Sequence, residues 1–102
     1  MWIIKPATTR EMARDNPQVE MALVRWLRIA KTARWKHLAE VRTAFRAADE
    51  VKVASGRSVV VFNIGGNKYR LIAAIHYNTG KLYVLDFMSH REYSLDRWKE
   101  SL

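Results

Sequence analysis

Hydrophobic residues along the chain change their spacing near its middle. In the first half they recur at the i, i+3, i+4 and i+7 positions that form one face of a helix, as in Val19, Leu23, Trp26 and Ala30. From Val51 onward, hydrophobic and polar residues alternate with a period of two, which is typical of β-strands. Helices followed by strands that tight turns connect predict an α+β domain, with the helices packed on one face of a sheet.

The helical half contains a short strand and three expected helices. Residues 2–4, Trp-Ile-Ile, suit a first strand. Thr8 and Glu11 have the spacing of a capping box, which predicts a short helix that ends near residues 15–16. The long helix follows from Pro17, a residue favoured in a first helical turn.

The pattern of the long helix is interrupted at residues 35–37, Trp-Lys-His. A third, shorter helix is then expected from Leu38 to about Ala48. Basic side chains of the long helix lie mostly off its hydrophobic stripe and form a broad polar face. This face fits ordinary solvation, and it also fits a surface that binds a partner.

Three strands are expected in the second half of the chain. Residues 59–62 are apolar enough for a buried strand, and residues 68–77 and 81–88 follow as the second and third strands. The intervening segments, 63–67 and 78–80, contain the Gly and Asn residues that tolerate positive φ angles in turns. The result is an antiparallel meander.

Alternation divides the middle strand into two faces. Tyr69, Leu71 and Tyr77 belong to the more apolar face, which should meet the helices. Lys68 and Arg70 belong to the other face, which we expect to be open. Two neighbouring cations repel each other unless an anion lies between them, so this pair predicts a phosphate site. Ordinary solubilising charges on an exposed strand are the alternative.

The end of the third strand carries side chains suited to proton transfer. His90 exchanges protons near neutral pH, and Tyr93 offers a hydroxyl group and a stacking surface. A single histidine is more often structural than functional. Here the functional reading gains support because both residues, with Arg91, could converge with Arg70 on one sheet face. Ser94 is expected to cap a last short helix.

Composition limits the classes of chemistry. The length of 102 residues and a hydrophobic content of 49% suit one folded domain over residues 1–102. The absence of cysteine excludes disulfides and thiolate nucleophiles, and no set of side chains has metal-ligand spacing. We therefore expect no metal and no cofactor. The N-terminus lacks the apolar run of about 7–15 residues of a signal peptide and the run of about 20 of a membrane span, so a cytoplasmic protein without membrane contact is expected.

Charge adds a prediction about the partner. The net charge is +8, from 18 basic and 10 acidic residues. Residues 51–85 contain five basic residues and no acidic residue. Such a surface attracts polyanions, so we expect nucleic acid or an acidic protein partner, and a merely solvated surface is the alternative.

RNA cleavage would suit these residue types. The substrate carries its own nucleophile, the 2′-hydroxyl beside the scissile phosphate. The protein must accept that proton, stabilise the negative charge that develops and protonate the leaving 5′ oxygen. A histidine, an arginine and a tyrosine or lysine can perform these steps without a metal ion.

Two segments resemble a known family. Residues 61–72, Val-Phe-Asn-Ile-Gly-Gly-Asn-Lys-Tyr-Arg-Leu-Ile, and residues 89–93, Ser-His-Arg-Glu-Tyr, are similar to the HigB group of bacterial type II toxins, as is the Trp-Lys pair at residues 35–36. The resemblance runs from about Ala7 to Tyr93. It implies a RelE-like fold, with N-terminal helices on a twisted antiparallel sheet and a short C-terminal helix. It also implies an endoribonuclease that cuts mRNA, usually on the translating ribosome, and a HigA-like helix-turn-helix antitoxin as partner.

The resemblance also implies roles for individual residues. Arg70 would stabilise the charge of the transition state, His90 would act as general acid or base, and Tyr93 would stack a base or share the proton transfer. The cations expected to hold RNA phosphates are Lys36, Lys68 and Arg91. Many relatives have Asp where this chain has Ser94, so a role for that acid does not carry over.

Two other functions fit the same features. A non-catalytic module that binds RNA or the ribosome would use the basic surface and leave His90 dispensable. A structural protein would use the surface to bind an acidic chain. Substitution of Arg70 and His90, and the identity of the neighbouring gene, would separate these alternatives.

Overall fold

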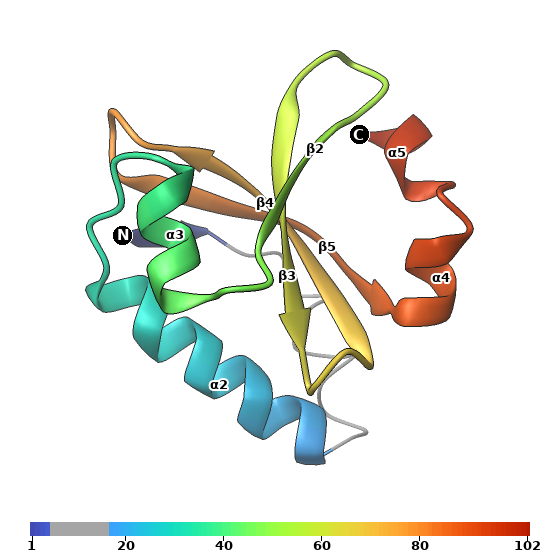
Figure 1. Cartoon of the computed structure of the whole chain (residues 1–102), viewed down its shortest axis with the longest axis horizontal. Coiled ribbons are helices and arrows are strands. Elements are labelled where there is room, and N and C mark those ends of the chain that lie inside the picture. The colour runs from blue at the N-terminus through green and yellow to red at the C-terminus, as the bar shows by residue number, and fades with distance from the viewer. Residues whose placement is uncertain (5–16) are drawn as a thin grey trace.

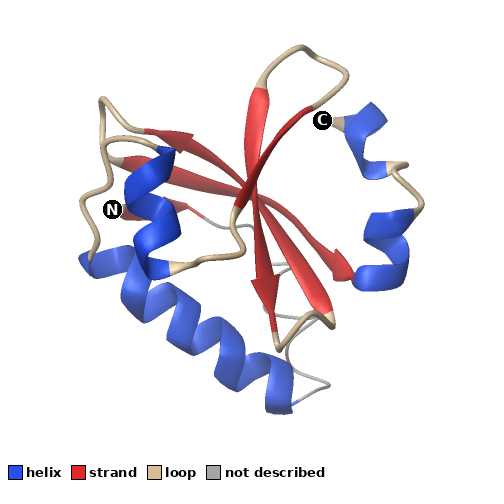
Figure 2. Ribbon diagram, viewed as in Figure 1, coloured by secondary structure: helices blue, strands red, loops and turns tan. Residues whose placement is uncertain are grey.

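The computed structural model describes residues 1–4 and 17–102, which form one sheet with helices on both of its faces (Figures 1 and 2). The elements are β1 (Trp2–Ile4), α2 (Pro17–Thr32), α3 (Leu38–Ala44), β2 (Asp49–Lys52), β3 (Ser58–Ile64), β4 (Tyr69–His76), β5 (Lys81–Ser89), α4 (His90–Ser94) and α5 (Trp98–Ser101). The short helix predicted to begin at Thr8 lies outside the described residues. The α+β class is confirmed.

The strands lie in the order β1-β5-β4-β3-β2. The antiparallel meander of β3, β4 and β5 is confirmed, with strands one or two residues from their predicted ends. The predicted first strand, β1, pairs with β5 in parallel, which makes the sheet mixed. At the other edge, β2 pairs antiparallel with β3. This strand was not predicted as a separate element.

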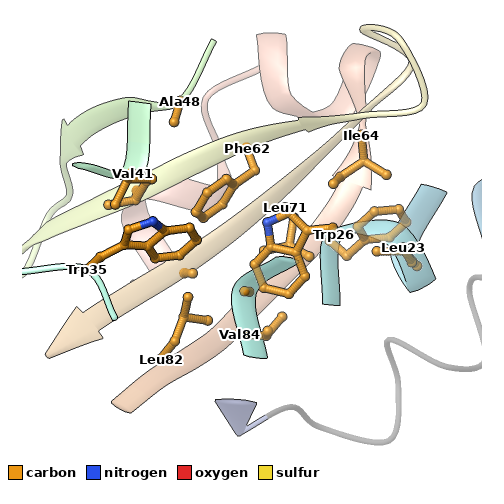
Figure 3. Packing of buried hydrophobic residues seen from close by; sticks show 14 of the residues in the cluster. Leu23, Trp26, Trp35, Val41, Ala48, Phe62, Ile64, Leu71, Leu82 and Val84 are labelled. Carbon is orange, nitrogen blue, oxygen red and sulfur yellow. The ribbon is translucent and has the colours of Figure 1, made fainter. Parts of the chain in front are cut away.

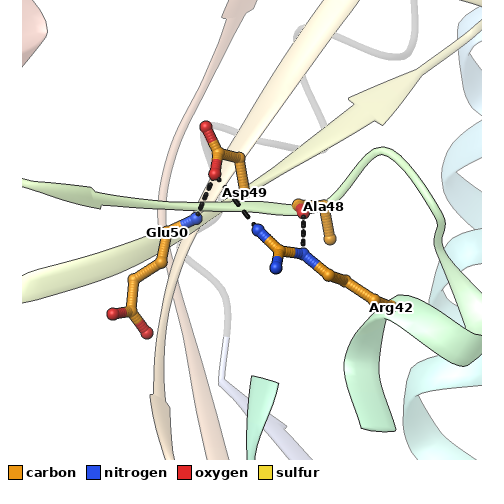
Figure 4. A network of polar contacts seen from close by, with 4 residues as sticks. All are labelled: Arg42, Ala48, Asp49 and Glu50. Carbon is orange, nitrogen blue, oxygen red and sulfur yellow. Dashed lines mark hydrogen bonds and ion pairs between the residues drawn. The ribbon is translucent and has the colours of Figure 1, made fainter. Parts of the chain in front are cut away.

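The start of β2 is held by a side chain from α3 (Figure 4). The guanidinium group of Arg42 donates from Nε to the Ala48 carbonyl at 2.9 Å, and its Nη2 atom lies 3.3 Å from a carboxylate oxygen of Asp49. The same Asp49 oxygen accepts the backbone N–H of Glu50 at 2.9 Å. Three of the four β2 residues, Asp49, Glu50 and Lys52, are charged and exposed, which explains why hydrophobic alternation does not reveal this strand.

The long helix packs on one face of the sheet, as predicted. Its buried residues include Val19, Leu23, Trp26 and Ala30, and Trp26 meets Phe62 of β3 edge to face at a centroid distance of 5.3 Å (Figure 3). Burial of each large apolar side chain stabilises a fold by about 1.5–3 kcal/mol. This packing fixes α2 against the middle of the sheet.

Helix α3 is shorter than the predicted segment. Phe45 takes an extended backbone conformation with φ −130° directly after the helix. Its ring contacts Phe62 at 5.2 Å and Trp35 at 6.0 Å between centroids. Because the aromatic core attracts the Phe45 ring, the chain leaves the helical path before Ala48.

The opposite face of the sheet, which was predicted to be open, is also covered. A second hydrophobic cluster contains Val59, Val61, Ile72, Met88 and Trp98, and Figure 1 shows α4 and α5 on the side away from α2 and α3. Arg70 lies on this face and is only 8% exposed. The prediction of an open face beside Arg70 was wrong, because the C-terminal segment folds back over the sheet.

A register shift lies between Ile72 and Ala73, where β4 pairs first with Asp86 and then with Val84 of β5. The extra residue in β5 resets the alternation of side chains. Consequently Phe87 packs with the α2 cluster, while Met88 packs with the second cluster near Arg70.

No helix in the described part of the chain is both long and apolar enough to cross a bilayer.

Candidate functional site

The predicted residues Arg70 and His90 meet where β4 begins and β5 ends. In the antiparallel register, Tyr69 lies opposite Ser89, and Arg70 lies opposite Met88. His90 follows β5 directly as the first residue of α4. The Nη2 atom of Arg70 lies 3.0 Å from Nδ1 of His90, although twenty residues separate them. The sheet register therefore creates this pair.

Neutral groups hold the Arg70 guanidinium in place. Its Nη1 atom donates to the Asn67 carbonyl at 2.9 Å and to the Tyr69 carbonyl at 3.1 Å. Among the described residues, Arg70 is the one charged side chain that is buried, and no carboxylate there forms an ion pair with it. A buried cation is costly unless an anion compensates it. The site therefore offers an oriented positive charge to an anionic ligand.

The contact with Arg70 determines which nitrogen of His90 carries the ring proton. A guanidinium group can only donate hydrogen bonds, so Nδ1 of His90 accepts and the ring proton lies on Nε2. The backbone N–H of His90 donates to the Lys68 carbonyl at 2.9 Å, which ties α4 to the β3–β4 turn. The His90 side chain itself is exposed. Substrate can therefore reach the His90 ring.

Serine hydroxyls stabilise both ends of α4. Ser89 is the N-cap, and its hydroxyl accepts the backbone N–H of Glu92 at 3.2 Å. Ser94 is the last residue of α4, and its hydroxyl donates to the His90 carbonyl at 2.9 Å. The prediction that Ser94 caps the last helix was wrong, because the last helix, α5, begins at Trp98 and has Arg97 as its N-cap. The chain ends its first C-terminal turn at Ser94 because it must bend again to bring α5 onto the sheet.

Tyr93 completes the cluster from the C-terminal side. The guanidinium carbon of Arg70 lies 5.4 Å from the centroid of the Tyr93 ring, in cation–π geometry. Burial is the largest influence and raises the pKa of Tyr93, while Lys99 and Arg70 lower it and Asp49 and Asp96 raise it. The phenol therefore keeps its proton at neutral pH. It can donate a hydrogen bond or stack, and it does not act as a resting base.

The end of β3 and the β3–β4 turn contribute two residues, Asn63 and Asn67, that were predicted only to form a turn. Asn67 has a φ of +80°, and its carbonyl accepts a hydrogen bond from Arg70. The side chain of Asn63 donates from Nδ2 to Oδ1 of Asn67 at 2.8 Å. Asn63 also lies opposite Arg70 in the sheet register. The Asn-x-x-x-Asn spacing was the only available signal, and it is shared with ordinary turns.

The three predicted phosphate-binding cations do not lie together. Lys68 is exposed in the β3–β4 turn, and its carbonyl bonds to His90. Arg91 is exposed and is the second residue of α4. Lys36 lies in the connection between α2 and α3, which Figure 1 shows far from α4 across the sheet. The fold brings Lys68 and Arg91 to the edge that holds His90, and it leaves Lys36 apart.

Acidic and histidine side chains do not gather in a metal-binding arrangement within residues 1–4 and 17–102. A shallow pocket lies instead between α2 and the β3–β4 turn, lined in part by Arg25, Trp26 and Gly65. The cluster of Arg70, His90 and Tyr93 contacts the same turn through the hydrogen bond from Arg70 to the Asn67 carbonyl. The side chains of this cluster can bind an anion, orient it and supply hydrogen-bond donors.

Comparisons with known proteins identify relatives of this chain. The sequence model of a family described as HigB_toxin, RelE-like toxic component of a toxin-antitoxin system, matches residues 19–96. A protein of Escherichia coli O6:H1 strain CFT073 named mRNA interferase HigB is 33% identical over 93 residues, which cover 91% of this chain and 88% of that protein. The mRNA interferase toxin HigB of Escherichia coli K12 is 27% identical over 93 residues, which again cover 91% of this chain and 88% of that protein. The chain belongs to the HigB family, the RelE-like toxic components of toxin–antitoxin systems.

Proposed function

We propose that this chain is a toxin that cuts mRNA, with Arg70, His90 and Tyr93 at the centre of the reaction. One observation carries the proposal: Arg70 is 8% exposed, and its guanidinium group contacts His90, Tyr93 and backbone carbonyls, with no carboxylate partner in the described part of the chain. A phosphodiester supplies the missing anion. The names of the HigB relatives support the choice of RNA as its source.

The proposed reaction uses the 2′-hydroxyl of the substrate as the nucleophile. The 2′ oxygen forms a bond to phosphorus, the bond to the 5′ oxygen breaks, and a cyclic phosphate remains. The proton of the 2′-hydroxyl passes to a base, and the 5′ oxygen receives a proton as it leaves. The protein must therefore provide a base, a donor and a stabiliser of the added negative charge.

Arg70 is the stabiliser in this scheme. A charged phosphate oxygen accepts more strongly from a guanidinium group than a neutral ring nitrogen does. RNA binding would therefore draw Nη2 of Arg70 from His90 to the phosphate. This exchange frees Nδ1 of His90 to accept the proton of the 2′-hydroxyl. The resting hydrogen bond at 3.0 Å thus keeps the ring oriented until substrate arrives.

Tyr93 can act in two ways. Its phenol retains its proton at neutral pH and can donate to the leaving 5′ oxygen. Its ring can also support a nucleobase by stacking. The two roles separate on substitution, since Tyr93→Phe keeps the ring and removes the donor, while Tyr93→Ala removes both.

The remaining cations would hold the nucleic acid at different places. Lys68 and Arg91 flank His90 and suit the phosphates beside the scissile bond. Lys36 would contact phosphate groups farther along the RNA or on the ribosome. We also propose that cleavage takes place on translating ribosomes in the cytoplasm, and that the neutralising partner is a HigA-like antitoxin with a helix-turn-helix. The net charge of +8 supports contact with a large RNA surface.

The direct test is to incubate the protein with translating ribosomes and to map the new 5′ ends of the mRNA. Wild-type protein should produce cuts, while Arg70→Ala and His90→Gln should reduce them by about 100-fold or more. Arg57→Ala, at an exposed arginine of the β2–β3 hairpin, is the matched control and should cut normally.

Absence of cuts with the wild-type protein, or equal cutting by the Arg70 and His90 variants, would overturn the proposal. Growth inhibition and ribosome binding that survive both substitutions would instead favour the non-catalytic RNA- or ribosome-binding module.

A further inference from the structure

Trp98 lies beyond residues 19–96, the span that matches the family, yet it packs against the site. It is the first residue of α5 and is 5% exposed. Its ring stacks on Tyr93 with a centroid distance of 5.2 Å and an interplanar angle of 18°. Its indole Nε1 donates to the Tyr93 carbonyl at 3.1 Å. Both the ring and the backbone of Tyr93 are therefore held by one side chain.

The same series of contacts continues to both sides. The Tyr93 ring meets the Arg70 guanidinium at 5.4 Å, and Arg70 meets His90 at 3.0 Å. On the other side, Nζ of Lys99 lies 5.7 Å from the centroid of the Trp98 ring. Electron-rich rings thus lie between two cations, an arrangement in which each contact is attractive. A displacement of Trp98 would therefore shift the Tyr93 ring, and the shifted ring would change the position of the Arg70 guanidinium group.

Trp98 is held by the sheet as well as by its contacts with α4. It belongs to the cluster that contains Val59, Ile72 and Met88. The carbonyl of Lys99 accepts the backbone N–H of Ala54 at 3.0 Å, which ties α5 to the β2–β3 hairpin. The position of Trp98 therefore depends on a rigid part of the fold. Tyr93, in contrast, lies in α4, a helix of five residues without a buried side chain.

We infer that Trp98 is a positioning residue of the reaction: it sets the plane of the Tyr93 ring and, through that ring, the orientation of the Arg70 guanidinium. The inference rests on the proposed function. Trp98 does not touch substrate in this role. Since a displacement of about 1 Å at a reacting group can slow a reaction about 100-fold, loss of the stack should reduce kcat.

The test compares Trp98→Phe, which keeps an aromatic ring, with Trp98→Leu, which fills the cluster without one. We expect Trp98→Phe to stay within about threefold of wild-type kcat and Trp98→Leu to lose about tenfold or more, with KM changed by less than about threefold in both. Trp2→Ala is the matched control, since Trp2 is 70% exposed on β1 and should leave kcat unchanged. Thermal unfolding of each variant locates a temperature at which all of them are folded.

A second measurement does not need activity. Ring protons of Tyr93 beneath an indole should show an upfield NMR shift, assigned with Tyr93→Phe. We expect this shift to diminish in Trp98→Phe and to disappear in Trp98→Leu. Equal Tyr93 resonances in all three proteins would overturn the stack itself, whatever the activity.

The kinetic measurements can also overturn the positioning role of Trp98. Wild-type kcat in folded Trp98→Leu, or equal losses in Trp98→Phe and Trp98→Leu, would overturn the positioning role. If wild-type protein cuts no RNA while the Tyr93 shift depends on Trp98, the proposed function fails and the stack stands.

Discussion

At the scale of single residues, the site depends on a buried cation that neutral acceptors hold. Arg70 contacts two carbonyls through Nη1 and one imidazole through Nη2, and its guanidinium carbon lies over one phenol ring. Together these contacts fix the orientation of the guanidinium group. Lysine could not reproduce this arrangement, since its ammonium group lacks the planar fork. The residue type at position 70 is therefore set by geometry as much as by charge.

The raised pKa of Tyr93 predicts how the stability of the protein depends on pH. Burial raises its pKa above the ordinary value of 10.0 in the folded chain. The unfolded chain ionises near that ordinary value, so above about pH 10 the unfolded state binds fewer protons than the folded state. Stability is therefore unaffected by this group at lower pH and falls as the pH rises past that point. We expect Tyr93→Phe to lose less free energy of unfolding than wild type between about pH 9 and about pH 11, measured by urea unfolding.

Tyr77 provides a comparison for this measurement. Burial, followed by the charge of Glu50, also raises its pKa, and Tyr77 packs in the cluster beside α2, away from Arg70. Tyr77→Phe should change the pH dependence in the same direction and leave RNA cleavage unchanged. Identical pH profiles for wild type and Tyr93→Phe would contradict a partly buried phenol with a raised pKa.

At the scale of elements, the β3–β4 turn is the part of the scaffold that positions Arg70. Gly65 and Gly66 have φ angles of +65° and +62°, and Asn67 follows at +80°. Such angles favour glycine and are tolerated by asparagine. The turn thereby directs the Asn67 carbonyl at Arg70 while the Lys68 carbonyl receives the N–H of His90.

Substitution of Asn67 separates the backbone role from the side-chain role. Asn67→Gly keeps the positive φ and loses only the hydrogen bond from Asn63, so it should cost about 0.5–1.5 kcal/mol. Asn67→Ala loses the same bond and keeps a Cβ at positive φ without the polar side chain that lets asparagine tolerate this region, so it should be about 1–2 kcal/mol less stable than Asn67→Gly. Urea unfolding of both variants should therefore rank alanine below glycine in stability. The opposite order would show that backbone strain does not govern this position.

At the scale of the whole molecule, the C-terminal segment converts an open sheet into one that is covered on both faces. The cluster beside α2 supplies most of the buried side chains, and the smaller cluster beneath α5 surrounds Arg70 and Tyr93. Low solvent exposure strengthens the attraction between a cation and a phosphate. The same covering moves the cations available to solvent to the rim, where Lys68 and Arg91 lie.

This separation of cations predicts how RNA binding responds to salt. Removal of one cation that neutralises a phosphate of single-stranded RNA should reduce the slope of log K against log salt by about 0.7. Lys68→Ala and Arg91→Ala should each show this change with a short RNA that carries a 2′-deoxy nucleotide at the cut site. Lys36→Ala should not, since Lys36 lies across the sheet from the cluster. An effect of Lys36 on such a short RNA as large as that of Lys68 would refute this assignment.

Local chemistry was sufficient to predict the elements with strong periodicity. The hydrophobic stripe that begins at Val19 predicted α2, and alternation with Gly- and Asn-rich turns predicted β3, β4 and β5. The candidate residues Arg70, His90 and Tyr93 were also identified, because their side chains differ from the apolar residues around them and because two segments resemble the HigB group. These inferences use only neighbours along the chain, or a motif preserved as a string of residues.

Tertiary contacts decided the rest. The parallel pairing of β1, the strand β2, the burial of Arg70 and the distant position of Lys36 all depend on residues that are far apart in the sequence. Ser94 does not cap the last helix as predicted, because it is the last residue of α4, which begins directly where β5 ends. The sequence by itself determined which side chains are candidates for the chemistry, namely Arg70, His90 and Tyr93. The three-dimensional packing determined that one guanidinium group is buried beside His90 and Tyr93, since only long-range contacts can remove a charge from water and hold it there.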